Sequence, residues 1–228
     1  MRIHLAHYGL LIVMLALGGC APQTQHISET LSVALFGVSD ERATADYAES
    51  LPYASLFVSL DNAPHALLIL AWAEEGQHDP LALKWVSAQQ ELIVTEVGRI
   101  TKTVNLVVGN IQHFYASEPD PLSLNLLLAN TPKTWHYQLS WQDRQQQQHQ
   151  QPATSTFIVH QQQEKTLPNG VQSLIWVEEN VSLPLIKQSY SNHYWLDPTN
   201  GKVVASEQRL GPTGSQLALS IAKPFSGE

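Results

Sequence analysis

The chain has 228 residues, of which 43% are hydrophobic, and this apolar content suffices for one sizeable domain or two small ones. Its formal net charge is −8 at pH 7 and it has no basic cluster, which argues against nucleic acid as a partner and against a polybasic grip on anionic lipid. Only one cysteine is present, so an intrachain disulfide is excluded and stability must come from packing and strand pairing.

The first element along the chain is an export signal. Arg2 and the amino terminus supply positive charge, and residues 8–17 form an almost wholly apolar run. Ten residues rise about 15 Å as a helix, roughly half of a hydrocarbon core, so this run is too short to span a membrane stably. Its length instead fits the apolar region of a signal peptide.

The apolar run does not end in the A-x-A pattern of an ordinary secretory signal but in Leu17, Gly18, Gly19 and Cys20. This ending resembles the lipobox of bacterial lipoproteins, in which the cysteine thiol takes a diacylglycerol and the chain is cut just before it. A buried or disulfide-bonded Cys20 is the alternative, but it has no partner cysteine. We therefore expect a signal peptide at residues 1–19 and a lipid on Cys20.

The lipid alone would hold the protein at the membrane. Burial of about 0.8 kcal/mol per CH₂ makes two acyl chains an effectively stable anchor where one chain would be marginal. The next residue is Ala21 rather than Asp. The resemblance to lipoproteins then implies sorting to the periplasmic face of the outer membrane.

Two short helices are predicted after the signal. Residues 20–26 read as a lipidated polar tether. Residues 28–37 place apolar side chains at helical spacing between a serine that can cap the start and a glycine that can end the helix. Residues 44–50 predict a second helix.

The pattern then changes to strands. Short runs rich in apolar and β-branched residues, separated by turn signals, occur at 54–60, 66–73, 82–87, 91–96 and 99–104. This spacing predicts an antiparallel meander.

The middle of the chain predicts a helix and a hairpin. Residues 121–130 are leucine-rich and indicate a short central helix. Residues 134–141 predict a strand paired with 153–160. The glutamine-rich tract at 142–151 between them is interpreted as a solvated loop, with a polar interaction segment as the alternative.

The last third predicts two further hairpins. Asn169-Gly170 suits a type I′ turn before a strand at 171–178, and strands at 192–197 and 202–208 flank a second turn. The sequence therefore predicts a single mainly-β domain over residues 27–228. Its expected form is a curved antiparallel sheet, as a sandwich or partly open barrel, with short N-terminal and central helices.

Catalytic motifs are missing from the sequence. It has no G-x-S-x-G elbow, no phosphate-binding glycine loop and no H-E-x-x-H, and its histidines are scattered, so we expect no cofactor and no metal. Adjacent acids at Glu74-Glu75 and Glu178-Glu179 point to opposite faces of a strand and cannot form an acid/base couple by themselves. We expect each of them to be solvated at a strand end or hairpin.

Aromatic residues offer a different possibility. Trp135, Tyr137 and Trp141 share one face of a predicted strand, and Trp195 lies on another. Alternate aromatics could form a platform for sugar rings, but a period of two favours a role in the core.

A family pattern connects several segments along the chain. It comprises Pro52-Tyr53-Ala54-Ser55, Val94-Thr95, Gly98-Arg99-Ile100, Thr103, Asn192, Tyr194-Trp195-Leu196-Asp197, Gly201, Val203, Ser206, Gln208 and Gly211-Pro212. With the lipobox, these residues resemble the YjbF/GfcB family of lipoproteins over nearly all of the mature chain.

The resemblance implies a role in group 4 capsule or related exopolysaccharide export, beside a second periplasmic protein, an outer-membrane β-barrel protein and an export channel. It implies no catalytic activity. We therefore expect a non-enzymatic accessory that binds partner proteins or glycan, with Arg99, Trp135, Trp141 and Trp195 as candidate binding residues. A structural ion pair is the alternative role for Arg99.

Two other functions stay open. One is a periplasmic enzyme acting on a surface polysaccharide, which two carboxylates about 5 to 10 Å apart across an aromatic-lined groove would favour. The other is a general scaffold for envelope assembly.

Overall fold

The structure is a computed structural model that describes residues 43–76, 78 and 80–227. The expected signal peptide, the tether with Cys20 and the helix at 28–37 lie outside these residues. Within the described ranges, no helix has the length and apolar character required to cross a bilayer. Every strand of the described sheet and every residue of its core lies within residues 43–227, and a chain that starts at Ala21 contains all of them.

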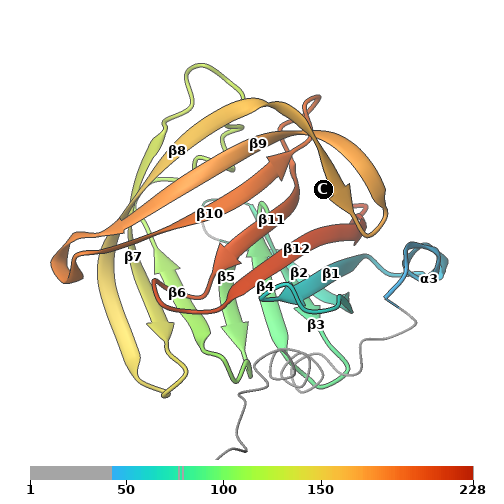
Figure 1. Cartoon of the computed structure of the whole chain (residues 1–228), viewed down its shortest axis with the longest axis horizontal. Helices are drawn as coiled ribbons and strands as arrows, with labels where there is room; N and C mark the ends of the chain where they lie inside the picture. Colours follow the sequence, from blue (N-terminus) through green and yellow to red (C-terminus); the bar gives the residue numbers. More distant parts are fainter. Residues whose placement is uncertain (1–42, 77, 79, 228) are drawn as a thin grey trace, which may run out of the picture.

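Twelve strands of the described chain form one antiparallel sheet in the order β5-β4-β3-β2-β1-β12-β11-β10-β9-β8-β7-β6. The sheet curls into a nearly closed barrel whose two edges are β5 and β6 (Figure 1). This confirms the mainly-β class and the partly open barrel. The strands are β1 (Ser55–Leu60), β2 (Ala66–Glu75), β3 (Leu81–Val86), β4 (Leu92–Glu96), β5 (Arg99–Val104), β6 (Asn110–Tyr115), β7 (Thr134–Gln142), β8 (Gln148–Leu167), β9 (Gly170–Leu183), β10 (Gln188–Leu196), β11 (Val203–Arg209) and β12 (Gln216–Lys223).

In residues 43–227, where the structure is described, two short helices accompany the sheet. The helix α3 (Ala45–Ser50) begins where the Thr44 hydroxyl accepts a hydrogen bond from the backbone N–H of Tyr47, which confirms the helix predicted at 44–50. A single 3₁₀ turn, η1 (Pro184–Ile186), joins β9 to β10.

Alternation along the strands builds the main core. On β7, buried residues alternate with exposed ones, and Trp135, Tyr137, Leu139 and Trp141 all point inward. The core interpretation of these aromatics is therefore confirmed. Strand β1 lies near the middle of the sheet and is buried along its whole length.

The opening between the two edge strands is held by side chains. In the described part of the chain, no backbone ladder joins β5 to β6. Near the loop that connects them, the Ile111 N–H donates to the Thr103 hydroxyl over 3.0 Å. At the other end of β5, the side-chain amide of Gln208 on β11 accepts from the Ile100 N–H at 2.9 Å and donates to the Gly98 carbonyl at 2.8 Å. The Gln208 amide thus supplies the backbone groups of Gly98 and Ile100 with the hydrogen-bond partners that a neighbouring strand would otherwise provide.

Strands β8 and β9 extend into a long hairpin arm. The pairing register of β8 and β9 shifts between Val159 and Gln162. The tip of the arm reaches the end of β12, where the Asn169 side chain donates to the Ile221 carbonyl at 3.2 Å (Figure 1). Because Leu167 pairs with Gly170, the central turn residues are Pro168 and Asn169. Proline cannot adopt the positive φ of a type I′ turn, so the hairpin is confirmed but its predicted turn type is wrong.

The predicted central helix is wrong. Residues 121–130 form successive turns instead. Asn125 has a φ of +57°, and the Thr131 hydroxyl donates to the carbonyls of Leu124 and Asn125. Polar side chains that bond nearby backbone groups compete with a helix, and they prevail in this segment.

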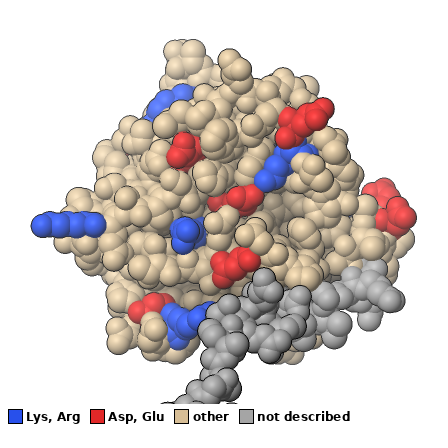
Figure 2. Space-filling model, in the orientation of Figure 1, with Lys and Arg blue, Asp and Glu red and all other residues tan. Residues whose placement is uncertain are grey.

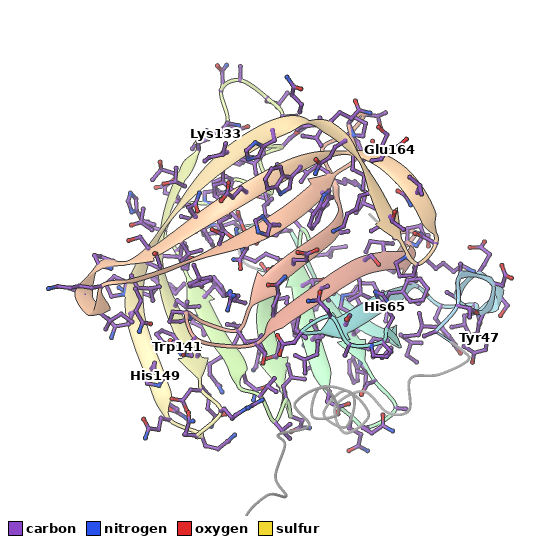
Figure 3. The ribbon with its side chains drawn as sticks, viewed as in Figure 1. Tyr47, His65, Lys133, Trp141, His149 and Glu164 are labelled. Carbon is purple, nitrogen blue, oxygen red and sulfur yellow. The ribbon has the colours of Figure 1, made fainter. Side chains whose placement is uncertain are left out.

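The glutamine-rich loop is shorter than expected. Only residues 143–147 form the turn, and β8 begins at Gln148 and pairs with β7. These glutamines can join the strand because backbone pairing does not depend on their side chains. At the start of β8, the His149 ring also stacks on Trp141 with the ring centroids 4.9 Å apart (Figure 3). Strands β6 and β12 were not predicted from the sequence.

Candidate functional site

A cleft of about 470 Å³ lies at the opening of the barrel, with both edge strands in its wall. Strands β2, β3, β4 and β7 and the segment after β6 complete it. We call it the seam cleft and define it by its charged and aromatic lining residues: Glu74, Glu75, His78, Lys84, Glu96, Arg99, Lys102, His113, Phe114, Asp120 and Trp135.

Arg99 forms the base of the seam cleft. Its side chain is only 2% exposed, and its guanidinium is ion-paired with Asp120 and, at 2.9 Å, with Glu179 of β9. This confirms the ion-pair role considered for Arg99. The guanidinium carbon also lies 4.9 Å from the Trp135 ring centroid and 5.8 Å from that of Phe114, which are cation–π distances. Of the four candidate binding residues from the sequence, Arg99 and Trp135 therefore come together in the cleft.

Glu179 is the partner that the sequence did not identify. Its carboxylate is completely buried and accepts hydrogen bonds from Ser155 at 2.6 Å, Asn192 at 2.8 Å and Tyr194 at 2.9 Å. The expectation that Glu179 is solvated is therefore wrong. Adjacent Glu178 lies on the other face, as strand alternation requires. Because no local pattern marks a residue whose partner is 80 positions away, only the folded sheet identifies it.

The charges at this base are fixed. Burial opposes the ionisation of Glu179, but the Arg99 charge and the hydrogen bonds outweigh it and lower the pKa of the carboxyl below its ordinary value. Burial likewise opposes the charge on Arg99, but Asp120 and Glu179 together raise the pKa of the guanidinium further. Both groups stay ionised over the physiological pH range.

Strand β2, which forms part of one wall, carries an exposed tryptophan next to a lining residue. Lys84, which lines the cleft, is ion-paired with Glu74. Trp72 is the direct cross-strand neighbour of Lys84 and therefore shares its face, and its side chain is 61% exposed. Sequence reasoning did not single out Trp72, although a tryptophan beside two acids at a strand end was visible.

The opposite wall carries an exposed tyrosine. His113 of β6 lines the cleft, and its ring stacks with that of Tyr115 at a centroid distance of 6.5 Å and an interplanar angle of 25°. The Tyr115 side chain is also 61% exposed. An aromatic side chain open to solvent thus stands on each side of the seam cleft.

Charges of both signs are interspersed at the surface. Figure 2 shows acidic and basic side chains scattered over one face without a patch of a single sign. The lining of the seam cleft is mixed in the same way. Such a surface does not select a highly charged ligand of either sign.

The other residues singled out in the sequence lie elsewhere. Trp141 is buried against His149 (Figure 3). Trp195 is buried beneath the hairpin arm, where the Lys165 ammonium lies 3.5 Å from its ring centroid. The lipidation residue Cys20 and its neighbours Leu17, Gly18, Gly19 and Ala21 fall outside the described residues. Among the residues that the structure does describe, no group of three or more His, Cys, Asp or Glu side chains could hold a metal ion.

Comparison with known proteins gives a family match and two close relatives. The model of the family "Group 4 capsule polysaccharide lipoprotein gfcB, YjbF" matches residues 28–221. The lipoprotein YjbF of Escherichia coli (strain K12) is 29% identical over 204 residues, which cover 89% of this chain and 90% of YjbF. The lipoprotein GfcB of the same strain is 28% identical over 218 residues, which cover 94% of this chain and 97% of GfcB.

The fold also has a solved counterpart. The crystal structure of the lipoprotein YmcC from E. coli K12 superposes with a TM-score of 0.70 at 21% identity, over 91% of this chain and 98% of that chain. This similarity establishes the same fold.

Proposed function

The chain belongs to the group 4 capsule polysaccharide lipoprotein family of GfcB and YjbF, and from this membership we propose that it is a non-enzymatic accessory of capsule or exopolysaccharide export. In this proposal Cys20 carries the lipid that anchors the protein to the periplasmic face of the outer membrane. The seam cleft then binds a segment of the exported polysaccharide beside the export proteins, a periplasmic protein and an outer-membrane barrel.

The geometry of the seam cleft carries the proposal. Trp72 and Tyr115 offer exposed rings on its two sides, and sugar rings present C–H faces that pack on aromatic surfaces. Between them the side chains of Glu74 and Lys84 are already ion-paired. Paired charges retain lone pairs and N–H groups for hydroxyls, so the cleft suits a hydroxyl-rich chain better than a strongly charged one.

The non-enzymatic part of the proposal rests on the carboxylates at the base. Asp120 and Glu179 do occupy an aromatic-lined space, which is the arrangement that would favour a glycosidase. However, the same guanidinium binds both of them, and the pKa of Glu179 is lowered. A general acid for glycoside cleavage needs a raised pKa. The two carboxylates at the bottom of the cleft therefore support a structural role instead.

A deletion strain complemented with single variants tests the proposal. We expect deletion to lower surface polysaccharide without stopping sugar polymerisation. Trp72→Ala and Tyr115→Ala, which alter the aromatics beside the lining residues Lys84 and His113, should fail to restore it. Tyr53→Ala, which alters a similarly exposed aromatic between α3 and β1, should restore it fully.

Protein level and folding of each variant are controlled by immunoblot and thermal melt. Normal surface polysaccharide in both cleft variants would rule out the seam cleft as the binding site. Glycan cleavage by the pure protein that is lost in Asp120→Asn would replace the proposal with the enzyme function. An unchanged surface polysaccharide in the deletion strain, together with a general envelope defect, would favour the scaffold.

A further inference from the structure

A second cavity, of about 410 Å³, lies between strands β3, β4, β11 and β12 and the turns at 122–125 and 200–203. Much of its wall is apolar and belongs to the main core or packs directly on it, through Leu56, Leu81, Leu83, Trp85, Val97 and Leu122. Protein cores are close-packed and seldom leave voids larger than a water molecule. A hollow of this size and lining is typical of a site for an apolar ligand.

Two hydroxyl groups in the wall already accept hydrogen bonds from other side chains. The Trp85 indole N–H donates to the Thr95 hydroxyl at 2.8 Å. The Ser206 hydroxyl accepts from the Gln208 amide at 2.8 Å. With these two groups partnered and most of the remaining lining apolar, the interior favours hydrocarbon over a polar ligand.

The solvent-exposed part of the lining is polar. Asn200 and Lys202 of the β10–β11 turn are exposed, and the Asn125 side chain reaches across to donate to the Asn200 carbonyl at 3.3 Å. The mouth thus combines a cationic amine with amide groups, while the interior is apolar. This division matches an amphiphile with an aliphatic tail and an anionic headgroup.

The cavity lies beside the point where the amino-terminal segment of the described chain enters the sheet. Its wall includes Ile221, which pairs with Leu56 next to the Lys223–Ser55 pair. Lys223 in turn donates to the carbonyls of Glu49 and Leu51, at the end of α3. The segment that leads from the lipidated end therefore enters the sheet beside the cavity.

From these observations we propose that the cavity binds one acyl chain of a separate anionic membrane lipid, with the lipid headgroup at Lys202. The proposal is independent of the glycan site, because the seam cleft and this cavity differ in charge and in most of their lining. It gives the protein a second contact with the membrane besides its own anchor.

Binding of cis-parinaric acid, with palmitate as competitor, tests the cavity in protein that starts at Ala21. We expect saturable binding that palmitate displaces. Leu81→Trp should fill the cavity and weaken binding about tenfold or more, and Lys202→Glu should weaken palmitate but not dodecylamine. Leu185→Trp, at a 73% exposed position on η1, is the matched control and should bind normally.

Ile221→Phe serves as a second filling variant if Leu81→Trp does not fold. Equal binding by wild type and a folded filling variant would overturn the proposal, as would an absence of saturable binding. The source of the acyl chain is tested with lipidated protein in vesicles of phosphatidylethanolamine and photoactivatable phosphatidylglycerol. Crosslinking to cavity residues supports a separate lipid. If only protein without lipid on Cys20 binds an acyl chain, the cavity holds the protein's own lipid and the proposal is wrong.

Discussion

The Nη1 atom of Arg99 lies 2.9 Å from Oε1 and 3.0 Å from Oε2 of Glu179, and the pair joins an edge strand of the sheet to β9. Neither side chain is more than 2% exposed. Removing two charges from water is expensive, so such a pair adds little net stability but is very costly to break from one side. The pair fixes where β5 lies, and with it the base of the seam cleft.

Replacing Arg99 with methionine should therefore strongly destabilise the protein. The change leaves Glu179 and Asp120 without their shared cation, and the expected loss of unfolding free energy is about 3–5 kcal/mol. Guanidinium denaturation measures it. Arg144→Met, on the exposed turn before β8, is the control and should change stability by less than about 0.5 kcal/mol. A loss under about 1 kcal/mol in Arg99→Met would contradict the buried pair.

Acid should weaken the protein through Glu179. Its pKa is lower in the folded chain than the ordinary value of 4.5. The resulting stabilisation is fully present above pH 4.5 and is lost as the pH falls through the lower folded pKa. Glu179→Gln should remove this part of the pH dependence. If denaturant midpoints of wild type and Glu179→Gln fall in parallel below pH 4.5, Glu179 is not the responsible group.

Alanine substitutions at two glycines with positive φ allow the cost of backbone strain to be measured apart from the cost of a steric clash. Gly201 has a φ of +74°, and an added Cβ would lie 2.1 Å from the Asn125 Oδ1 atom, whereas Gly170 has a φ of +117° and open space. Gly170→Ala should cost about 1–2 kcal/mol from strain alone, and Gly201→Ala about 1–3 kcal/mol more. Thermal melts compare them. Equal losses would show that Asn125 moves aside freely.

The lipid anchor has its own test. Cys20→Ser should leave an uncleaved precursor that a fatty-acid analogue does not label, because the thiol is the acceptor. Ala21→Asp should move the protein from the outer-membrane to the inner-membrane fraction of a sucrose gradient. Equal labelling of Cys20→Ser, or unchanged fractionation of Ala21→Asp, would contradict the corresponding step.

Local patterns predicted the hairpins well. Gly98 and Gly201 lie in the turns between predicted strands, where hairpins need positive φ, and both have it. The inward face of β7 followed from alternation of its aromatic residues. Strand β6 was missed because a register irregularity between Ile111 and His113 breaks the period of two. Strand β12 was missed because its small residues have weak β-propensity.

Closure of the barrel could not be predicted from local patterns. Strand β1 pairs with β12 from the opposite end of the domain, and Arg99 meets Glu179 across 80 positions. Such pairings depend on the whole sheet and leave no periodicity in either segment. The seam cleft could not be predicted for the same reason. Its walls include β5 and β6, which lie at opposite ends of the strand order and meet only because the whole sheet curls.

Binding of surface polysaccharide in the seam cleft is the step on which the proposed function depends. Isothermal titration of isolated surface polysaccharide into protein starting at Ala21 tests it most directly. We expect saturable binding that weakens about tenfold or more in Trp72→Ala and is unchanged in Tyr53→Ala. Absence of binding by the wild-type protein, or equal binding by wild type and a folded Trp72→Ala, would contradict it.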